Sequence, residues 1–234
     1  MSPAPPFDAI VFDLDGTLVD TAPDLHAHLD ALLTELGRPG LDLEEIRPLI
    51  GDGARALLRR GLEVSGGVPP EVDLDRQFAT FLERYTAAPA RWGRPYVGVV
   101  MALEKLTAAG CRLGLCTNKP QAPTDRLLEA YDLRRYFAAA IGGDALAVKK
   151  PDGRHALAVL DQLGVGAQGA VMVGDSANDV LAAHAAGMPC ILVSFGYTPV
   201  PACELGAERV IDHFDDLLPA LAALRRSCGR LTGR

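Results

Sequence analysis

The chain has 234 residues, of which 49% are hydrophobic and 23% are charged, a composition typical of a soluble globular protein with a sizeable core. Its formal net charge of −7 argues against nucleic acid or an anionic membrane as a partner, because both require a basic surface. No apolar run approaches the ~18 to 20 residues of a membrane span, and the chain does not begin with a basic segment followed by a long apolar one, so we expect a cytoplasmic protein without a signal peptide.

In chain order, the first predicted element is a strand over Ala9–Phe12, a short apolar run of the kind that is buried on both faces of a sheet. The segment 18–93 contains no convincing strand and reads as helical, with Thr21 as a plausible cap of its first helix. We therefore predict that residues 18–93 form an inserted α-helical cap domain and that residues 1–17 and 94–234 form the core domain. The helices expected in the insertion span residues 23–36, 42–49, 53–64 and 70–87.

Beyond the insertion, short apolar strands alternate with helical segments. Such alternation predicts right-handed crossovers and a doubly wound, Rossmann-like parallel sheet, so the expected fold class is α/β with an inserted all-α cap. The predicted strands span residues 112–116, 138–141, 170–173, 190–193 and 209–211. The predicted helices span residues 97–109, 121–131, 153–163, 177–186 and 214–226.

Polar side chains follow four of the predicted strands. Sites in open parallel sheets form outside the carboxyl ends of the strands, so these residues are the first candidates for function. Asp13 and Asp15 come directly after the first strand, although burying a charge costs several kcal/mol unless something compensates it. The other strand ends offer Thr117 and Asn118, then Lys150, and then Asp175 and Asp179 within "GDSAND".

Together the four strand ends indicate a site for phosphoryl transfer. Asp175 and Asp179 lie four residues apart at a predicted helix start, so their carboxylates can share one face, and with Asp13 they could hold a hard divalent cation, Mg²⁺. The cation would compensate the clustered negative charge and permit a carboxylate to approach a phosphate. Asp13 could then attack phosphorus, giving an aspartyl-phosphate that water hydrolyses, with Asp15 acting as acid and then as base.

The other phosphate oxygens need partners as well. Thr117, Lys150 and nearby backbone N–H groups would bind them and stabilise charge in the transition state. Arg55 could reach a substrate carboxylate as a bidentate partner, although it could also lie on a solvated helix face or pair with Glu63. The substrate-binding candidates are thus Gly16, Thr17, Asn118 and Arg55.

These residues carry a resemblance to a known family, the haloacid-dehalogenase-like (HAD) hydrolases. "DLDGT", "CTN", "KKP" and "GDSAND" resemble the four motifs of the family in order, and the helical insertion resembles the class of cap that closes over small substrates. The resemblance implies that Asp13 is the nucleophile and Asp15 the acid and base. It also implies phosphate binding by Thr117 and Lys150. Its Mg²⁺ ligands would be Asp13, the backbone carbonyl of Asp15 and Asp175, with Asp179 close by or acting through water.

Within the family, the chain most resembles the phosphoglycolate phosphatases, on residues 12–25, 51–62, 116–120 and 195–197. This implies a Mg²⁺-dependent phosphomonoesterase that converts 2-phosphoglycolate and water to glycolate and phosphate. The turn after Lys150, "KKPDGRHAL", departs from the Lys-Pro-x-Pro pattern common in that branch. Another small-metabolite phosphatase, a pyrophosphatase or a β-phosphoglucomutase-like enzyme would share the same site and stay open as alternatives.

Other classes of protein fit the residues less well. A dehalogenase of the family would not need Asp15, and a phosphonoacetaldehyde hydrolase would need a cap lysine, which residues 18–93 lack. A phospho-accepting receiver module of a signalling protein also combines acidic residues, Mg²⁺, a hydroxyl and a lysine, but it has no inserted lid of the kind that excludes water from an active site. We therefore expect a phosphoric monoester hydrolase that acts on a small phosphorylated metabolite as a monomer or homodimer.

Overall fold

The computed structural model of the protein describes residues 7–68 and 72–231, with side chains as far as residue 226. The first six residues, on which the expected absence of a signal peptide depends, lie outside the described residues. The predicted start of a helix at residue 70 lies outside them too.

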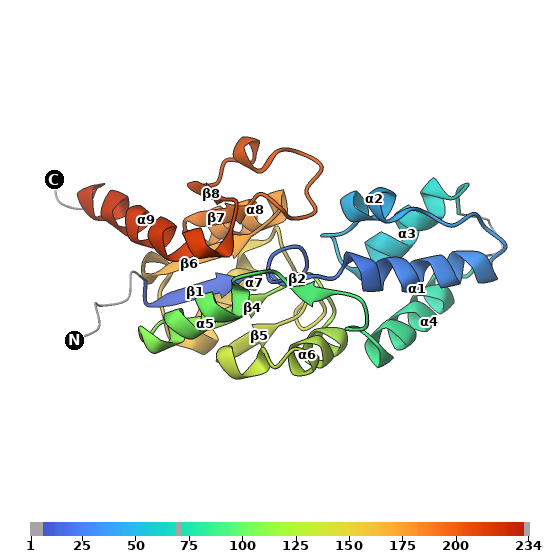
Figure 1. The fold of residues 1–234 in the computed structure, drawn as a ribbon, viewed down its shortest axis with the longest axis horizontal. Coiled ribbons are helices and arrows are strands. Elements are labelled where there is room, and N and C mark those ends of the chain that lie inside the picture. Colours follow the sequence, from blue (N-terminus) through green and yellow to red (C-terminus); the bar gives the residue numbers. More distant parts are fainter. Residues whose placement is uncertain (1–6, 69–71, 232–234) are drawn as a thin grey trace.

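A six-stranded parallel sheet forms the core of the protein (Figure 1), which confirms the predicted α/β fold class. Its strands are β1 (Ala9–Phe12), β4 (Arg112–Cys116), β5 (Ala139–Ile141), β6 (Ala170–Gly174), β7 (Cys190–Val193) and β8 (Arg209–Ile211). They follow the order β5-β4-β1-β6-β7-β8, so β1 lies inside the sheet between β4 and β6. Phe12 of β1 is in register with Leu115 and Val173, and the carboxyl ends of these three strands therefore meet at one edge.

Helices cover both faces of the sheet because each interior strand presents apolar side chains to both sides. These helices are α5 (Val99–Ala108), α6 (Gln121–Ala130), α7 (Gly153–Leu163), α8 (Ala177–Ala186) and α9 (Leu217–Leu231). Ile10 and Phe12 of β1 pack with residues of α5, α6 and α9, whereas Ala9 and Val11 pack with residues of α7 and α8. Short 3₁₀ helices span Arg134–Tyr136, Ala167–Gly169, Ala202–Glu204 and Phe214–Asp216.

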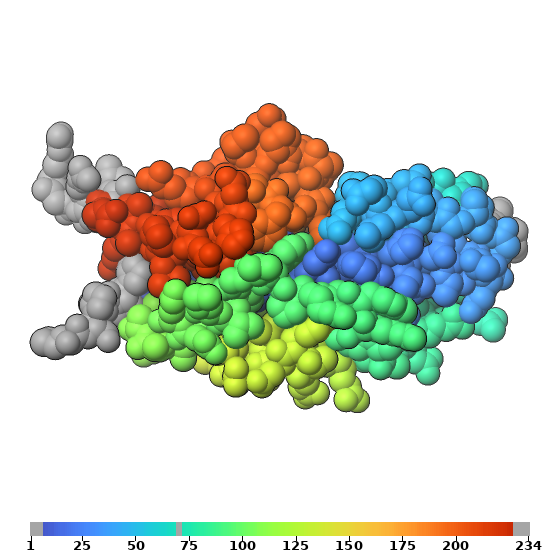
Figure 2. All heavy atoms as spheres, viewed as in Figure 1, coloured from blue at the N-terminus to red at the C-terminus, as the bar shows by residue number. Residues whose placement is uncertain are grey.

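Between β1 and α5 the chain forms a lobe of helices with a hydrophobic core of its own. The lobe contains α1 (Ala22–Glu35), α2 (Leu43–Ile46), α3 (Ala54–Val64) and α4 (Leu74–Ala87). Leu29, Leu58 and Phe81, one from each of the three longer helices, are buried together. Figure 2 shows this helical lobe, blue to teal, at one end of the molecule. The division into domains at residues 18 and 93 stays a prediction. Within the described part of the chain, no helix is long and apolar enough to cross a membrane.

The helix predicted over residues 42–49 is shorter than expected. The structure has α2 over Leu43–Ile46 and then a separate 3₁₀ helix over Arg47–Leu49. Pro48 lies in this second segment, and a proline inside an α-helix lacks the N–H for the helical hydrogen bond and clashes with the carbonyl four residues before it. The α-helical geometry therefore ends before Pro48.

The prediction that residues 18–93 contain no strand is wrong at the start of the segment. β2 (Val19–Asp20) pairs antiparallel with β3 (Arg94–Pro95), so the chain leaving the core is joined to the chain returning to it. Each strand has two residues, which is too short for a periodic pattern to be recognised in the sequence.

Asp24, in the first turn of α1, holds the returning chain from the lobe side. Its side chain is fully buried and accepts hydrogen bonds from the backbone N–H groups of Arg91, Trp92 and Gly93 at 2.8, 3.0 and 2.7 Å. A carboxylate that accepts three backbone N–H groups is well compensated in the interior. The joint between lobe and core is therefore stabilised by a buried charge as well as by strand pairing.

A turn before α3 holds the lobe against the core. Asn118 Nδ2 donates to the carbonyl oxygen of Gly51 at 3.0 Å, and Lys149 Nζ donates to that of Asp52 at 2.6 Å. Asn178 Nδ2 donates to Asp52 Oδ1 at 2.8 Å. All three donors come from loops or helix starts that follow core strands, so the lobe is closed over the carboxyl end of the sheet.

Replacing Gly53 with alanine should weaken this closure. Gly53 has a φ of +90°, and a Cβ there would lie 2.8 Å from the carbonyl oxygen of Asn118. We expect Gly53→Ala to lower the free energy of unfolding by about 1 kcal/mol through the backbone alone. We also expect amide hydrogen exchange over residues 51–58 to become about tenfold faster or more, because the turn can no longer approach the core.

Gly37→Ala is the matched control. Gly37 has a φ of +69°, but a Cβ there would meet nothing within 4 Å. This variant should lose similar stability and leave hydrogen exchange over 51–58 as it is in the wild type. Equal exchange in both variants would contradict the docking role of Gly53.

Candidate active site

Three buried carboxylates converge where β1 and β6 end. Asp13 follows β1, Asp175 follows β6, and Asp179 lies in the first turn of α8. One oxygen atom from each lies within 4.8 Å of the others. The structure thus brings together three of the four aspartates that the sequence assigns to a cation.

Asp179 uses both of its oxygens inside the protein. Its Oδ2 accepts from the backbone N–H groups of Asp175 and Ser176 at 3.1 and 3.0 Å and from the Ser176 hydroxyl at 2.8 Å, which completes a capping box at the start of α8. Its Oδ1 accepts from Lys150 Nζ at 2.7 Å. Asp175 accepts one hydrogen bond on each oxygen and Asp13 pairs with Lys150 alone, so these two carboxylates have the more open coordination.

Lys150 places its ammonium inside this cluster. Nζ lies 2.8 Å from Asp13 Oδ1 and 2.7 Å from Asp179 Oδ1, and the side chain is 1% exposed. Burial by itself would lower the pKa of Lys150, but the charges of Asp13 and Asp179 outweigh burial and raise it. The lysine therefore stays charged and compensates part of the negative charge.

One lysine does not compensate the whole cluster. Burial raises the pKa of Asp13 to about 6 despite the nearby Lys150, and Asp179 adds to the rise. Burial, with the charges of Asp179 and Asp13 adding to it, raises the pKa of Asp175 well above its usual range. An excess of buried carboxylates with oxygen ligands alone is the donor set of a hard divalent cation, so the residues fit such an ion.

The second aspartate of the first loop, Asp15, turns away from the cluster toward the lobe. Its Oδ1 accepts from Lys119 Nζ at 3.0 Å and from the Thr21 hydroxyl at 2.8 Å, and its Oδ2 lies 3.3 Å from the same Nζ. Thr21 lies at the N-cap position of α1, as predicted, but its hydroxyl donates to Asp15 and makes no cap bond to the helix.

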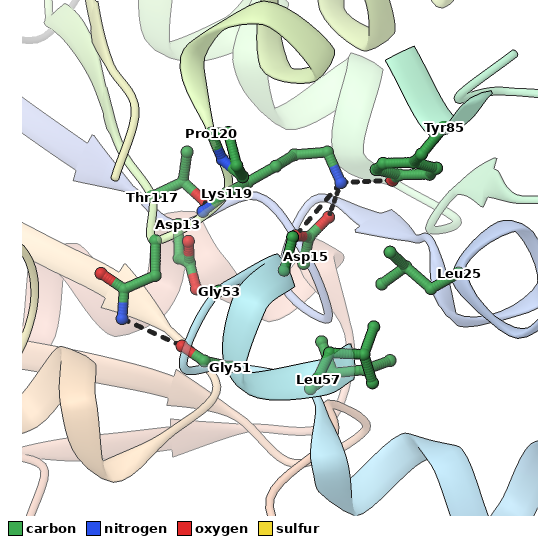
Figure 3. Close-up of a pocket in the computed structure, with 13 residues that line it drawn as sticks. Asp13, Asp15, Leu25, Gly51, Gly53, Leu57, Tyr85, Thr117, Lys119 and Pro120 are labelled. Atoms are coloured by element: carbon green, nitrogen blue, oxygen red, sulfur yellow. Dashed lines mark hydrogen bonds and ion pairs between the residues drawn. The ribbon is translucent and has the colours of Figure 1, made fainter. Parts of the chain in front are cut away.

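A pocket of about 400 Å³, its open mouth included, lies between the lobe and the core (Figure 3). The core contributes Asp13, Asp15, Thr117 and Lys119 to its lining. The lobe contributes Leu25, Ile50, Leu57 and Tyr85. One end of the pocket is therefore polar and charged, and the lobe covers it with mostly apolar side chains.

Thr117 and Asn118 line this pocket, as their position after β4 predicts. Thr117 is 1% exposed, and its Oγ1 accepts from the backbone N–H of Lys119 at 3.2 Å. Asn118 Nδ2 donates to the carbonyl oxygen of Lys150 at 3.0 Å in addition to its bond to the lobe. Asn118 therefore connects three segments: the loop after β4, the Lys150 loop and the lobe.

Gly16 and Thr17 support the site from behind and are not among the residues that line the pocket. The Gly16 N–H donates to the carbonyl oxygen of Val19 at 3.0 Å, and a Cβ on Gly16 would lie 2.5 Å from Asp175 Oδ2. The Thr17 hydroxyl donates to Asp175 Oδ1 at 3.3 Å. Both residues thus hold the first loop against Asp175.

Arg55, the predicted carboxylate partner, is likewise not brought to the pocket lining. Its guanidinium pairs with Asp75 of α4, and its Cζ lies 5.5 Å from the centroid of the Phe78 ring. Its side chain is 54% exposed. Among its neighbours in α3, Arg59 pairs with Glu63 at 3.6 Å.

Sequence reasoning missed Lys119 and Tyr85 as site residues. Lys119 Nζ donates to the Tyr85 hydroxyl across the gap between core and lobe, and it lies 4.3 Å from the centroid of the Tyr85 ring (Figure 3). The position of Lys119 directly after Thr117 and Asn118 was a signal that could have identified it. Tyr85 offered no signal, because it reads as one apolar position among others in a helix.

Tyr197 is a third residue that the sequence did not identify as functional. Its backbone N–H donates to Asp175 Oδ2 at 2.8 Å. Its hydroxyl accepts from the backbone N–H groups of Thr21 and Ala22 at 2.7 and 2.9 Å and donates to Asp20 Oδ1 at 2.7 Å. Tyr197 therefore links the carboxylate cluster to the joint between lobe and core.

His155, at the start of α7, holds the backbone of Lys150. Its Nδ1 accepts from the Lys150 N–H at 3.2 Å, so the proton of the neutral ring is on Nε2. The side chain is fully buried. Burial, and then the positive charge of Lys150, lower the pKa of His155 to about 4.

Comparisons with known proteins identify a family and several relatives of this chain. A model of the haloacid dehalogenase-like hydrolase family matches residues 10–193. A protein of Agrobacterium fabrum named phosphoglycolate phosphatase is 43% identical over 211 residues, which cover 90% of this chain and 91% of the relative. The structure of a predicted phosphoglycolate phosphatase from Haemophilus somnus has a TM-score of 0.85 and 29% identity, covering 92% of this chain and 98% of that one. A CbbY variant from Rhodobacter sphaeroides in complex with xylulose-(1,5)bisphosphate has a TM-score of 0.77 and 28% identity, covering 90% and 96%.

The buried state of His155 predicts how stability depends on pH. Its pKa is about 4 in the folded protein against an ordinary value of 6.5, so the unfolded chain takes up the proton first as the pH falls. The contribution of His155 to stability is thus fully present above about pH 6.5 and is lost as the pH falls toward 4. Between pH 7 and pH 5 the wild type should lose about 1 to 2 kcal/mol more unfolding free energy than His155→Asn, measured by urea denaturation in EDTA.

The partly exposed His184 serves as the control position for this experiment, because its ring lies beside Glu208 at the surface. His184→Asn removes an imidazole from the surface and so controls for the histidine-to-asparagine change itself. Parallel pH curves for the wild type and His155→Asn would show that His155 is not held neutral.

Proposed function

Because the chain belongs to the haloacid dehalogenase-like hydrolase family and is a phosphoric monoester hydrolase, we propose that its reaction is the hydrolysis of 2-phosphoglycolate to glycolate and phosphate. The substrate is supported by relatives of that name that match nearly the whole chain. It is also supported by the pocket, whose polar end at Asp13 and Thr117 is covered by apolar side chains of the lobe.

The observation that carries the proposal is the position of Asp13. Its carboxylate lies at the end of β1, lines the pocket and is paired with the buried Lys150. In the proposed reaction an Asp13 oxygen attacks phosphorus, the bond from phosphorus to the ester oxygen breaks, and Asp15 gives that oxygen a proton. Water then attacks the phosphorus of the aspartyl-phosphate while Asp15 takes the proton from the water, which frees Asp13 and releases phosphate.

Lys150 and Thr117 are the proposed partners of the phosphoryl oxygens. Lys150 is held on both sides, by the ion pairs of its ammonium with Asp13 and Asp179 and by the hydrogen bond of its backbone to His155. A cation and a hydroxyl that are fixed before the substrate binds stabilise the charge of the transition state without reorganisation. The remaining predicted contacts, from Gly16, Thr17 and Asn118, then act by holding the loops.

We propose Mg²⁺ as the cofactor, with Asp13 and Asp175 as carboxylate ligands together with the backbone carbonyl of Asp15. When bound, it would neutralise charge on the phosphoryl oxygens and permit the Asp13 carboxylate to approach phosphorus. Asp179 would act beside it by holding Lys150 and the start of α8. Thr17 and Tyr197 would keep Asp175 in place, because each donates a hydrogen bond to one of its oxygens.

The domain organisation, the location and the assembly state of the protein are also part of the proposal. Residues 18–93 would act as a cap domain that opens and closes on the core of residues 1–17 and 94–234, since the lobe has a separate hydrophobic core and is joined through β2 and β3. The protein would work in the cytoplasm on a small phosphorylated metabolite, as a monomer or homodimer, without nucleic acid or membrane as partner.

Phosphate release from a panel of esters tests this function. With Mg²⁺, kcat/KM for 2-phosphoglycolate should exceed that for pyrophosphate, β-glucose 1-phosphate and p-nitrophenyl phosphate by about 100-fold, as expected where a site recognises a polar group of its substrate. Release should stop in EDTA. Activity spread evenly over the panel would keep the chemistry and reject the substrate, and formation of glucose 6-phosphate from β-glucose 1-phosphate would indicate a mutase.

Asp13→Asn tests the chemistry separately from the substrate. Loss of the nucleophile should lower kcat by about 1,000-fold or more, because catalytic groups that act as a unit fail together. Asp161→Asn is the matched control, since Asp161 is exposed on α7. A fully active Asp13→Asn protein would reject the aspartyl-phosphate route.

A further inference from the structure

Lys119 is a buried cation to which the proposed phosphoryl transfer assigns no role. Its side chain is 2% exposed, and its Nζ lies between the Asp15 carboxylate and the Tyr85 hydroxyl. Lys150, the proposed partner of the phosphoryl group, pairs instead with Asp13 and Asp179 in the carboxylate cluster. Among the residues that line the pocket, Lys119 is the one cation, and it faces the apolar side chains of Leu25 and Leu57 (Figure 3).

The pairing of Lys119 with Asp15 conflicts with the proposed role of Asp15 as the general acid. A general acid must reach the oxygen that it protonates, at about 2.6 to 3.2 Å. Asp15 cannot turn to a leaving oxygen while Oδ1 is held by Lys119 and Thr21 and Oδ2 lies against the same lysine. Breaking this pair alone would leave a buried ammonium without a negatively charged partner, which is strongly unfavourable. A second anion is needed before Asp15 can move.

We propose that Lys119 recognises the carboxylate of the substrate and exchanges Asp15 for it. This rests on the proposed function, because 2-phosphoglycolate carries a carboxylate at the end opposite its phosphate. When the phosphate lies at Asp13, the other end of such a short molecule extends into the pocket toward the lobe, where Lys119 is the available cation. The ammonium then remains paired throughout, and Asp15 becomes free to face the ester oxygen.

Tyr85 makes this recognition depend on the lobe. It comes from α4, its side chain is fully buried, and its hydroxyl oxygen accepts from Lys119 Nζ. Because burial raises the pKa of Tyr85 well above its usual range, the phenol keeps its proton. With its oxygen accepting from Lys119, the hydroxyl can donate this proton to a carboxylate bound at the same ammonium. Closure of the lobe thus completes a site with two donors for the carboxylate.

Arg55, the other cation considered for this role, is less suited to it. Its guanidinium is occupied by Asp75 and its side chain is about half exposed, so an ion pair formed there would be weakened by solvent. An ion pair at Lys119 forms out of water, where the same charges interact more strongly.

The proposal predicts that an anionic group in the substrate raises kcat as well as lowering KM. When an ester without a carboxylate binds, Lys119 stays paired with Asp15. Asp15 then cannot reach the leaving oxygen, and hydrolysis is slow. The matched pair of substrates is 2-phosphoglycolate and 2-hydroxyethyl phosphate, which have the same chain length and differ in a carboxylate against a hydroxymethyl group.

The experiment compares kcat and KM for both substrates in the wild type and in Lys119→Met. We expect the wild type to prefer 2-phosphoglycolate, and we expect Lys119→Met to lower the ratio of the two kcat/KM values by about 100-fold, the loss typical of a charged hydrogen bond in a closed site. Part of this change should be a higher kcat for 2-hydroxyethyl phosphate, because no lysine then holds Asp15, and part should be a higher KM for 2-phosphoglycolate. Tyr85→Phe keeps the ring, removes one donor, and should lower the ratio by about tenfold.

Lys105→Met is the matched control, because Lys105 is exposed on α5 and does not line the pocket. It should leave kcat/KM for both substrates, and their ratio, as in the wild type. Thermal melting of each variant shows that it is folded.

The outcomes separate the two levels of the proposal. A wild type that hydrolyses both esters equally would reject 2-phosphoglycolate as the substrate, and with it the recognition by Lys119. A wild type that discriminates while Lys119→Met discriminates equally would reject Lys119 alone and leave the function standing. If Lys119→Met does not fold, an unchanged ratio in Tyr85→Phe would overturn the proposal in the same way.

Discussion

Asp13, Asp175 and Asp179 are buried beside one another, and the ammonium of Lys150 lies among them. Removing carboxylates from water is costly, and mutual repulsion adds to the cost, so the surrounding chain must be arranged to hold them. Much of the local structure serves this purpose: His155 fixes the backbone of Lys150, and the capping box of α8 uses one oxygen of Asp179. The sheet supplies the rest, because its parallel strands deliver all of these residues to one edge.

The second constraint is that the site is shared between the core and the helical lobe. The core supplies the carboxylates and the lobe supplies most of the apolar cover, so the pocket exists only where the two meet. The joint is not a free linker, since β2 pairs with β3 and Asp24 holds the returning chain by three hydrogen bonds. Tyr197 contacts this joint and Asp175 at once. A change in the angle between the lobe and the core would therefore move a residue that is hydrogen-bonded to a carboxylate of the cluster.

The sequence predicted the parts of this arrangement that depend on local pattern. The apolar run of β1 and the ends of the parallel strands could be predicted from the sequence. Because parallel strands end at one edge of a sheet, these strand ends predicted that Asp13, Thr117 and Lys150 lie in one site. The pairing of Lys119 with Tyr85 could not be predicted from the sequence, since the two residues are 34 positions apart. Lys119 belongs to the core and Tyr85 to the lobe. The hydroxyl of Thr21 could satisfy either a helix start or Asp15, and local pattern does not distinguish the two.

The positions of Lys150 and Lys119 suggest why one site can separate chemistry from recognition. Both lysines follow core strands, yet Lys150 pairs with Asp13, the proposed nucleophile, and with Asp179, whereas Lys119 contacts Asp15 and Tyr85 of the lobe. Substitutions at the lobe positions that line the pocket would change what lies opposite Lys119 without touching the pairs of Lys150. Asp15 is the exception, because the proposed reaction uses it for proton transfer and Lys119, the proposed recognition residue, holds it. Under this proposal the choice of substrate would act on the proton transfer itself, so that a poorly fitting ester is rejected in the reaction step as well as in binding.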